Sequence, residues 1–207
     1  MTKKYWPALK PGDIVDVVVP AGRPKPETLN GVVPFLEKWG LQARIAKNAV
    51  GQDLLCGQSK DIRWANLKQA VMAQDSKMIW CVRGGYGSLH LLDHLRKLKP
   101  KKVKCFLGYS DITTLHTFFR QKWGWSTLHG PNIDRFALGD GSSVEASRIK
   151  NLIFGRQPEV SFSLRPLNAI GRQKQKILSE VVGGNLITLQ SSFCTPYSIS
   201  TKGKILF

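Results

Sequence analysis

The chain of 207 residues lacks the patterns by which several large classes of protein are recognised. No apolar run approaches the roughly 18 residues that a membrane-spanning helix needs. The basic N-terminus is not followed by the apolar stretch and small-residue cleavage site of a secretory signal. We therefore expect a soluble, unexported protein of the cytoplasm that does not bind a membrane.

Paired cysteine motifs are also missing. Cys56, Cys81, Cys105 and Cys194 are far apart and form no Cys-x-x-Cys pair, which gives little support to a zinc site or a dithiol redox site. Cys81 and Cys105 fall inside expected core strands, where cysteine usually behaves as a small hydrophobic residue. We expect all four thiols to be reduced, as is usual in the cytoplasm.

Acidic residues are scarce, since 14 Asp and Glu stand against 31 Lys and Arg and give a net charge of +17. Such an excess invites a nucleic-acid interpretation, because Lys and Arg neutralise phosphates in any fold. The positive charge is scattered in short clusters, however, without a long basic arm, an aromatic RNA-binding signature or zinc-finger spacing. We therefore do not expect nucleic acid to be the partner.

What the sequence does contain is an alternation of short apolar runs and amphipathic helical patterns. Runs rich in β-branched residues suit buried parallel strands, and apolar residues three or four apart suit the helices that cover them. This alternation predicts an α/β fold with a mostly parallel sheet flanked by helices. The expected strands are 14–19, 41–46, 77–82, 103–107 and 125–128, and the expected helices include 27–39, 88–98 and 142–154.

The composition turns polar and basic after residue 155, which predicts a linker with one short strand. A further strand is expected at 176–182, before an amphipathic segment that ends near residue 193. We thus predict an α/β domain over 1–155, a linker over 156–175 and the start of a smaller, β-rich second domain over 176–207. We interpret that second domain as incomplete, and its exposed strand edge and apolar surface favour association, including a homodimer.

The chain is organised around Gly108-Tyr109-Ser110-Asp111-Ile112-Thr113, where an apolar run gives way to a helical pattern. A serine at such a strand-to-helix turn has its hydroxyl lifted above the sheet edge, close to the first N–H groups of the helix. The usual nucleophile elbow is Gly-x-Ser-x-Gly, whereas position 112 here is Ile. A Ser-Asp pair that merely caps the helix is the alternative.

A second turn, Arg83-Gly84-Gly85-Tyr86-Gly87, directly follows the expected strand 77–82. Its glycines allow a tight turn with bare N–H groups, a cradle for a phosphate or an oxyanion, although turn geometry alone could also require them. Neither a dinucleotide fingerprint nor a P-loop fits it. Because the carboxyl ends of parallel strands meet at one edge, we expect both turns to face one pocket. The N–H groups of Gly84 or Gly85 and of Asp111 could then supply two oxyanion donors.

Four motifs in order resemble those of the L,D-carboxypeptidases, the muramoyltetrapeptide carboxypeptidase family of serine peptidases. They are Arg83-Gly84-Gly85-Tyr86-Gly87, Gly108-Tyr109-Ser110-Asp111-Ile112-Thr113 with Leu115-His116, His129-Gly130-Pro131 and Gly183-Gly184-Asn185-Leu186. The opening Leu9-Lys10-Pro11-Gly12-Asp13, with Pro20-Ala21-Gly22 after the first strand, is similar too. The resemblance covers essentially the whole chain.

The resemblance implies that Ser110 is the nucleophile and that the N–H groups of Asp111 and Gly85 form the oxyanion hole. It implies removal of the terminal D-alanine from murein tetrapeptide, across an L,D bond, during cytoplasmic recycling of the cell wall. Some relatives instead cleave a peptide-nucleotide antibiotic and confer immunity. The partner implied is a murein peptide, and no metal or organic cofactor is implied.

We further expect the substrate to contact Arg83, Gly84, Tyr86, His129 and Asn185. Two of these have a structural alternative, because His129 could belong to a turn and Asn185 could cap a helix. The family also uses a Glu and a His from a C-terminal domain, the Glu shortly after a strand that resembles Lys204-Ile205-Leu206-Phe207, and we expect both to be absent from this chain. His116 cannot replace that base from its own helix, because six residues at about 1.5 Å each place it some 9 Å along the axis from Ser110.

Three hypotheses follow. The first is an L,D-carboxypeptidase scaffold with Ser110 as its nucleophile, inactive if nothing replaces the missing base. The second is a module that binds the murein peptide without cleaving it. The third and least favoured is a basic nucleic-acid binder, whose binding would be salt-sensitive and indifferent to Ser110→Ala.

Overall fold

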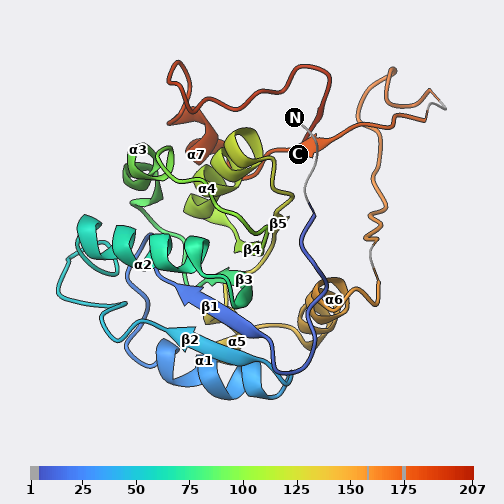
Figure 1. Cartoon of the computed structure of the whole chain (residues 1–207). Helices are drawn as coiled ribbons and strands as arrows, with labels where there is room; N and C mark the ends of the chain where they lie inside the picture. The colour runs from blue at the N-terminus through green and yellow to red at the C-terminus, as the bar shows by residue number, and fades with distance from the viewer. Residues whose placement is uncertain (1–4, 158, 174–175) are drawn as a thin grey trace.

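A five-stranded parallel sheet forms the centre of the molecule in the computed structural model, which describes residues 5–157, 159–173 and 176–207. Its strand order is β2-β1-β3-β4-β5, and every neighbouring pair is parallel (Figure 1). The strands are β1 (Ile14–Val18), β2 (Gln42–Ile45), β3 (Ser76–Cys81), β4 (Cys105–Gly108) and β5 (Leu128–His129). The chain therefore adopts the expected α/β fold with a mostly parallel sheet.

Helices cover both faces of this sheet, because each strand sends alternate side chains to opposite sides. One apolar cluster joins Val15 and Val17 of β1 to α1 (Thr28–Glu37), α5 (Asp134–Ala137) and α6 (Ser143–Ile153). The other joins Val18 to the helices of the second face. These are α2 (Lys60–Met72), η1 (Ser88–Leu91), α3 (Leu92–Leu95), η2 (Ser110–Ile112), α4 (Thr113–Phe118) and η3 (Phe119–Trp123).

The strand order reverses at β1, from which the chain moves outward to β2 on one side and to β3, β4 and β5 on the other. In open parallel sheets, the crevice beyond the carboxyl ends of the strands at such a switch is where ligands bind. The turns that follow β1, β3 and β4 all lie at that edge. The fold therefore brings the serine turn and the glycine turn to one place.

Several element boundaries differ from the sequence expectations. The predicted helix 88–98 is a short 3₁₀ turn followed by the four-residue α3, and the predicted strand 125–128 is the two-residue β5. The predicted strand 176–182 is reduced to β6 (Val181–Val182), and the described residues from 159 to 173 contain no strand. Pro100 follows the first of these segments, and a residue before proline disfavours helix.

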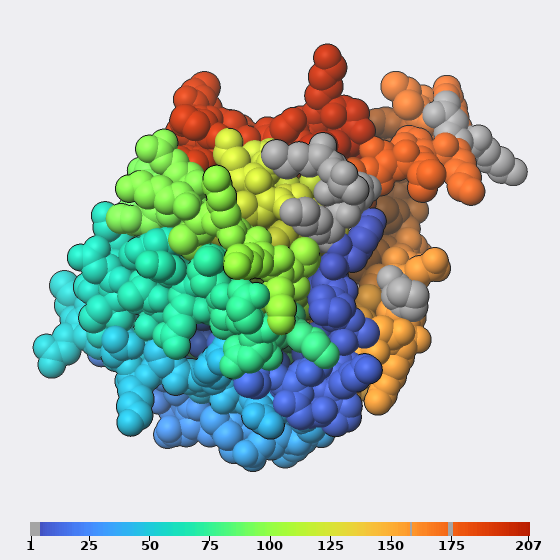
Figure 2. Space-filling model, in the orientation of Figure 1, coloured from blue at the N-terminus to red at the C-terminus, as the bar shows by residue number. Residues whose placement is uncertain are grey.

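A small second sheet follows the main domain. β6 pairs in parallel with β7 (Ile205–Leu206), and α7 (Leu186–Gln190) lies between them in the chain. The segments before β6 project from the main body (Figures 1 and 2) and expose Phe162, Leu164 and Leu178. The start of a second, β-containing region is therefore present, as expected.

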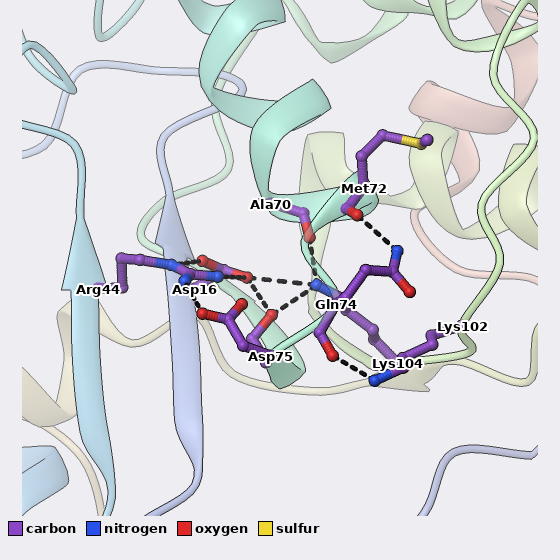
Figure 3. A network of polar contacts seen from close by, with 9 residues as sticks. Asp16, Arg44, Ala70, Met72, Gln74, Asp75, Lys102 and Lys104 are labelled. Atoms are coloured by element: carbon purple, nitrogen blue, oxygen red, sulfur yellow. Dashed lines mark hydrogen bonds and ion pairs between the residues drawn. The ribbon is translucent and has the colours of Figure 1, made fainter.

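A buried polar network lies under α2 (Figure 3), where it includes the first residue of β3 and the residue before β4. Asp16 of β1 accepts two bonds from the Arg44 guanidinium, at 2.6 and 3.1 Å, and one from the Ser76 hydroxyl. The fully buried Lys104 ammonium donates to Ser76 Oγ and to Ala70 O, both at 2.5 Å, and lies 3.4 Å from Asp16 Oδ2. Burial lowers the pKa of Lys104, although Asp16 opposes that effect. The network ties β1, β2 and β3 to the residue before β4.

Candidate active site

Ser110 has a left-handed backbone, with φ of +65°. Non-glycine residues rarely adopt this conformation, and a strained serine between a strand and a helix is the geometry of a nucleophile elbow. Asn132 holds the turn in place, because its buried Oδ1 accepts a hydrogen bond from the Tyr109 N–H at 3.2 Å. Gly108 suits this position, because a Cβ there would lie 2.8 Å from Ile112 Cγ2 and 3.0 Å from that same Oδ1. The Gly-x-Ser-x-Gly pattern is thus dispensable for the elbow geometry itself.

The glycine turn lies directly against this serine. A Cβ added to Gly84 would be 2.8 Å from Ser110 Cβ and 3.1 Å from Ser110 Oγ, so any larger residue would collide with the hydroxyl-bearing side chain. Gly85 has φ of +102°, which favours glycine. The turn after β1 supports both, since Gly22 N donates to Gly84 O at 2.8 Å. The expected convergence of turns at one sheet edge is confirmed.

Two backbone donors stand free at this junction. Among the described residues, the Gly85 N–H has no acceptor. Asp111 lies in the first turn of the helical segment that starts at Ser110, where N–H groups have no carbonyl one turn earlier to donate to. The Ser110 hydroxyl likewise has no hydrogen-bond partner within the part of the chain that the structure describes. A serine oxygen beside two free N–H groups is an arrangement that suits acyl transfer.

Arg63 of α2 anchors the far end of the glycine turn. Its buried guanidinium donates from Nη1 to Pro20 O at 2.6 Å and to Gly87 O at 2.9 Å. The Cys56 thiol, whose pKa is raised by burial, donates to Tyr86 O at 3.4 Å. Neither Arg63 nor Asn132 was expected from the sequence, because their partners lie 24 and 23 residues away in the chain and leave no local pattern.

The other predicted substrate-binding residues are less closely gathered. Arg83 and Tyr86 are exposed, and the Tyr86 hydroxyl is 3.1 Å from His90 Nε2. The Asn185 side chain caps α7, accepting the Thr188 N–H at 3.0 Å, which is the structural alternative considered above. Its own N–H donates to Thr113 Oγ1 at 3.0 Å, and this bond ties the C-terminal segment to the helix that Ser110 begins.

Two histidines lie behind the elbow. His116 is buried, and its Nε2–H donates to Gly108 O at 2.9 Å. Burial lowers the pKa of His116 to about 3, so the ring is neutral and serves to hold the strand end. His129 pairs in register with Gly108 and lines a cavity of about 240 Å³ with His116, Arg120 and Phe207. Ser110 does not line that cavity. Contact of His129 with the substrate therefore remains a prediction, beside the alternative that it belongs to a turn.

The structure gives little support to a metal site, a disulfide or a membrane-spanning helix. In the described ranges, no group of three or more His, Cys, Asp or Glu residues is arranged to hold a metal ion. All four cysteines are unpaired thiols in the structure. None of the helices in these ranges combines the length and the apolar character needed to cross a bilayer.

Residues 15–130 match the family model described as the LD-carboxypeptidase N-terminal domain. The chain belongs to the L,D-carboxypeptidase family. It is 36% identical over 197 residues to a putative carboxypeptidase of Rickettsia conorii, covering 93% of this chain and 62% of that protein. It is 35% identical over 202 residues to a probable murein peptide carboxypeptidase of Bacillus subtilis, covering 97% of this chain and 63% of that protein.

The fold is similar to that of an MccF-like protein of Bacillus anthracis, with a TM-score of 0.77 at 23% identity, over 99% of this chain and 69% of that one. The chain spans less than two thirds of the length of the curated relatives from Rickettsia conorii and Bacillus subtilis.

Proposed function

We propose that Ser110 is the nucleophile of a serine-type L,D-carboxypeptidase that releases the terminal D-alanine of murein tetrapeptide. The observation that carries the proposal is the left-handed backbone of Ser110, which presses a serine against the glycine turn beside two free N–H groups. Family membership supports the reaction class, and the Bacillus subtilis relative is a probable murein peptide carboxypeptidase.

In the proposed reaction, Ser110 Oγ attacks the carbonyl carbon of the L,D bond and loses its proton to a base. The carbonyl oxygen becomes an oxyanion that accepts hydrogen bonds from the N–H groups of Gly85 and Asp111. The tetrahedral intermediate then expels D-alanine, whose amine takes up the proton, and water hydrolyses the acyl-serine. Arg83, Tyr86, His129 and Asn185 remain candidates for holding the peptide, with Arg83 and Tyr86 on the glycine turn itself.

The described residues do not supply the general base that the first step of this reaction needs. A serine hydroxyl needs a base to become a good nucleophile, yet His116 is committed to Gly108 O and kept neutral by burial. The family resemblance assigns the base to a Glu and a His of the family's C-terminal domain. The alternative of a binding module without turnover is therefore tested in the same experiment.

The experiment measures D-alanine released from murein tetrapeptide by this chain and by Ser110→Ala. Release that the substitution abolishes would support Ser110 as nucleophile and require a base. Tetrapeptide binding without release would favour the binding module, and the absence of both would contradict the proposal. The similarity to the MccF-like protein shows the fold alone and does not support cleavage of a peptide-nucleotide antibiotic by this chain.

A further inference from the structure

The serine turn and the glycine turn are joined by a pair of buried hydrogen bonds between Ser88 and Asp111. The Ser88 N–H donates to Asp111 Oδ2 at 2.9 Å, and the Ser88 hydroxyl donates to the main-chain oxygen of Asp111 at 2.7 Å. Ser88 is completely buried and Asp111 is 9% exposed. Ser88 begins the helical turn that directly follows Gly87, so one residue from each turn takes part.

These bonds restrain Asp111 on two sides and leave its N–H free. One bond fixes the Asp111 carboxylate and the other fixes the Asp111 carbonyl. The side chain and the peptide group that follows Asp111 can therefore move only together with Ser88. Ser88 in turn is three positions from Gly85, the other proposed oxyanion donor. In the described part of the chain, no other hydrogen bond directly links residues 83–88 to residues 108–113.

Each turn is also held from outside. The glycine turn is tied by Gly22 at Gly84 O and by Arg63 at Gly87 O, and the serine turn is tied by Asn132 at Tyr109 N. These anchors attach the turns to different parts of the molecule. They do not by themselves set the separation between the turns, which is the quantity that matters when two N–H groups must reach one oxygen.

We propose that the Ser88–Asp111 pair is a positioning device that sets the spacing of the two oxyanion donors and thereby controls how fast Ser110 reacts. The Asp111 carboxylate and the Ser88 hydroxyl do not touch the substrate in this scheme. The inference rests on the proposed function of Ser110, and it adds a role for two side chains that the reaction itself does not require.

The test uses the rate at which a fluorophosphonate modifies Ser110, followed by intact mass, because the phosphoryl oxygen of the adduct occupies the oxyanion position. Ser88→Ala removes the bond to the Asp111 carbonyl and leaves the N–H to the carboxylate. The matched control is Ser192→Ala, which removes another buried serine hydroxyl that donates to a backbone oxygen, Leu189 O at 2.8 Å, in the C-terminal segment. Thermal unfolding of both variants measures the loss of stability.

We expect Ser88→Ala to slow the modification about 10-fold or more, since misplacement of catalytic donors by a fraction of an ångström to 1 Å reduces rates by factors up to about 100. Ser192→Ala should react like the native chain, and both variants should lose similar stability. Where turnover is measurable, kcat should fall with KM unchanged. Asp111→Asn, which keeps an oxygen for the Ser88 N–H, should retain more of the rate than Asp111→Ala.

Two failures are distinguishable. The reaction is run at alkaline pH, where hydroxide takes the serine proton in place of the missing base. If the native chain is not modified at Ser110 under that condition, the proposed nucleophile is wrong and the positioning role falls with it. If Ser110 is modified equally fast in the native chain, Ser88→Ala and Ser192→Ala, the nucleophile stands and the positioning role is wrong.

Discussion

The backbone of Ser110 is held in a region that disfavours any residue with a Cβ by about 1–2 kcal/mol. Its φ of +65° is one of two positive values among the described non-glycine residues, the other being that of Cys194. A strained backbone conformation persists where surrounding contacts hold it in place. Here those contacts come from Asn132, Gly84 and Ser88. The left-handed backbone places the Ser110 hydroxyl beside the glycine turn, whereas a helical φ would direct it elsewhere.

Replacing Ser110 by glycine should therefore relieve strain while removing the nucleophile. We expect Ser110→Gly to be about 0.5–1 kcal/mol more stable than Ser110→Ala, since both lose the hydroxyl and only the alanine keeps the strained Cβ. Urea unfolding of the two variants measures the difference. A glycine variant that is less stable than the alanine variant would contradict the assignment of strain to the Cβ.

His116 should make the folded state sensitive to acid. Its pKa falls from 6.5 to about 3 on folding, so the unfolded chain takes up a proton between these values that the folded chain does not. Stability is thus fully present above pH 6.5 and decreases as the pH falls. Between pH 7.5 and pH 5.5 the contribution lost is about 1.4 kcal/mol.

The check is urea unfolding at both pH values for the native chain and His116→Gln, whose amide can donate to Gly108 O but does not titrate. The variant should lose about 1.4 kcal/mol less over this range. Equal losses in the two proteins would show that other groups account for the acid sensitivity.

At this scale the sequence revealed the residues that form local motifs and missed those that act across the chain. Ser110 and the glycines were predicted, because turns restrict the residue types they accept. Asn132, Arg63 and the Ser88–Asp111 pair were not, since each acts on a partner at least 23 residues away. The residue types of Ser88 and Asp111 suit helix caps equally well, and only the tertiary structure distinguishes the two uses.

The strands show where periodicity suffices and where it does not. β1, β3 and β4 lie at the centre of the sheet and have the mostly apolar runs that buried parallel strands need, so their positions were predicted closely. β6 has a single neighbour, β7, and its chain remains irregular before Val181 despite an apolar pattern. The spacing of apolar residues shows which face of a strand can be buried. Whether the segment forms a strand also depends on a partner strand with which it can form hydrogen bonds.

The network beneath α2 offers a test at the scale of the elements it joins. Lys104→Met should destabilise the fold by about 2–4 kcal/mol, because it removes one partner from buried charges and leaves Ser76 Oγ and Ala70 O without their donor. Lys102→Met, the same change at an exposed residue that donates to Gln74 O, should stay within about 0.5 kcal/mol. Chemical denaturation measures both, and equal effects would contradict a structural role for the buried ammonium.

Over the whole molecule, the sequence predicted the α/β architecture and its site edge better than the C-terminal region. The first domain carries its own core on both faces of the sheet, so local patterns and tertiary structure agree. After residue 159, apolar side chains such as Phe162, Leu164 and Leu178 are at least 74% exposed. The domain boundaries at 155 and 175, and association through this surface, remain predictions.

The partners that hold the serine turn lie on both sides of it in the chain. Ser88 precedes Asp111 by 23 residues, and Asn132 follows Tyr109 by 23. A strained backbone is kept only while its surroundings enforce it. During synthesis, therefore, we expect Ser110 to leave the ribosome with a relaxed backbone and to adopt its left-handed conformation only once Asn132 has emerged and docked. If Ser110 is the nucleophile that we propose, the nascent chain would gain its catalytic geometry only when the sheet around the serine turn is complete.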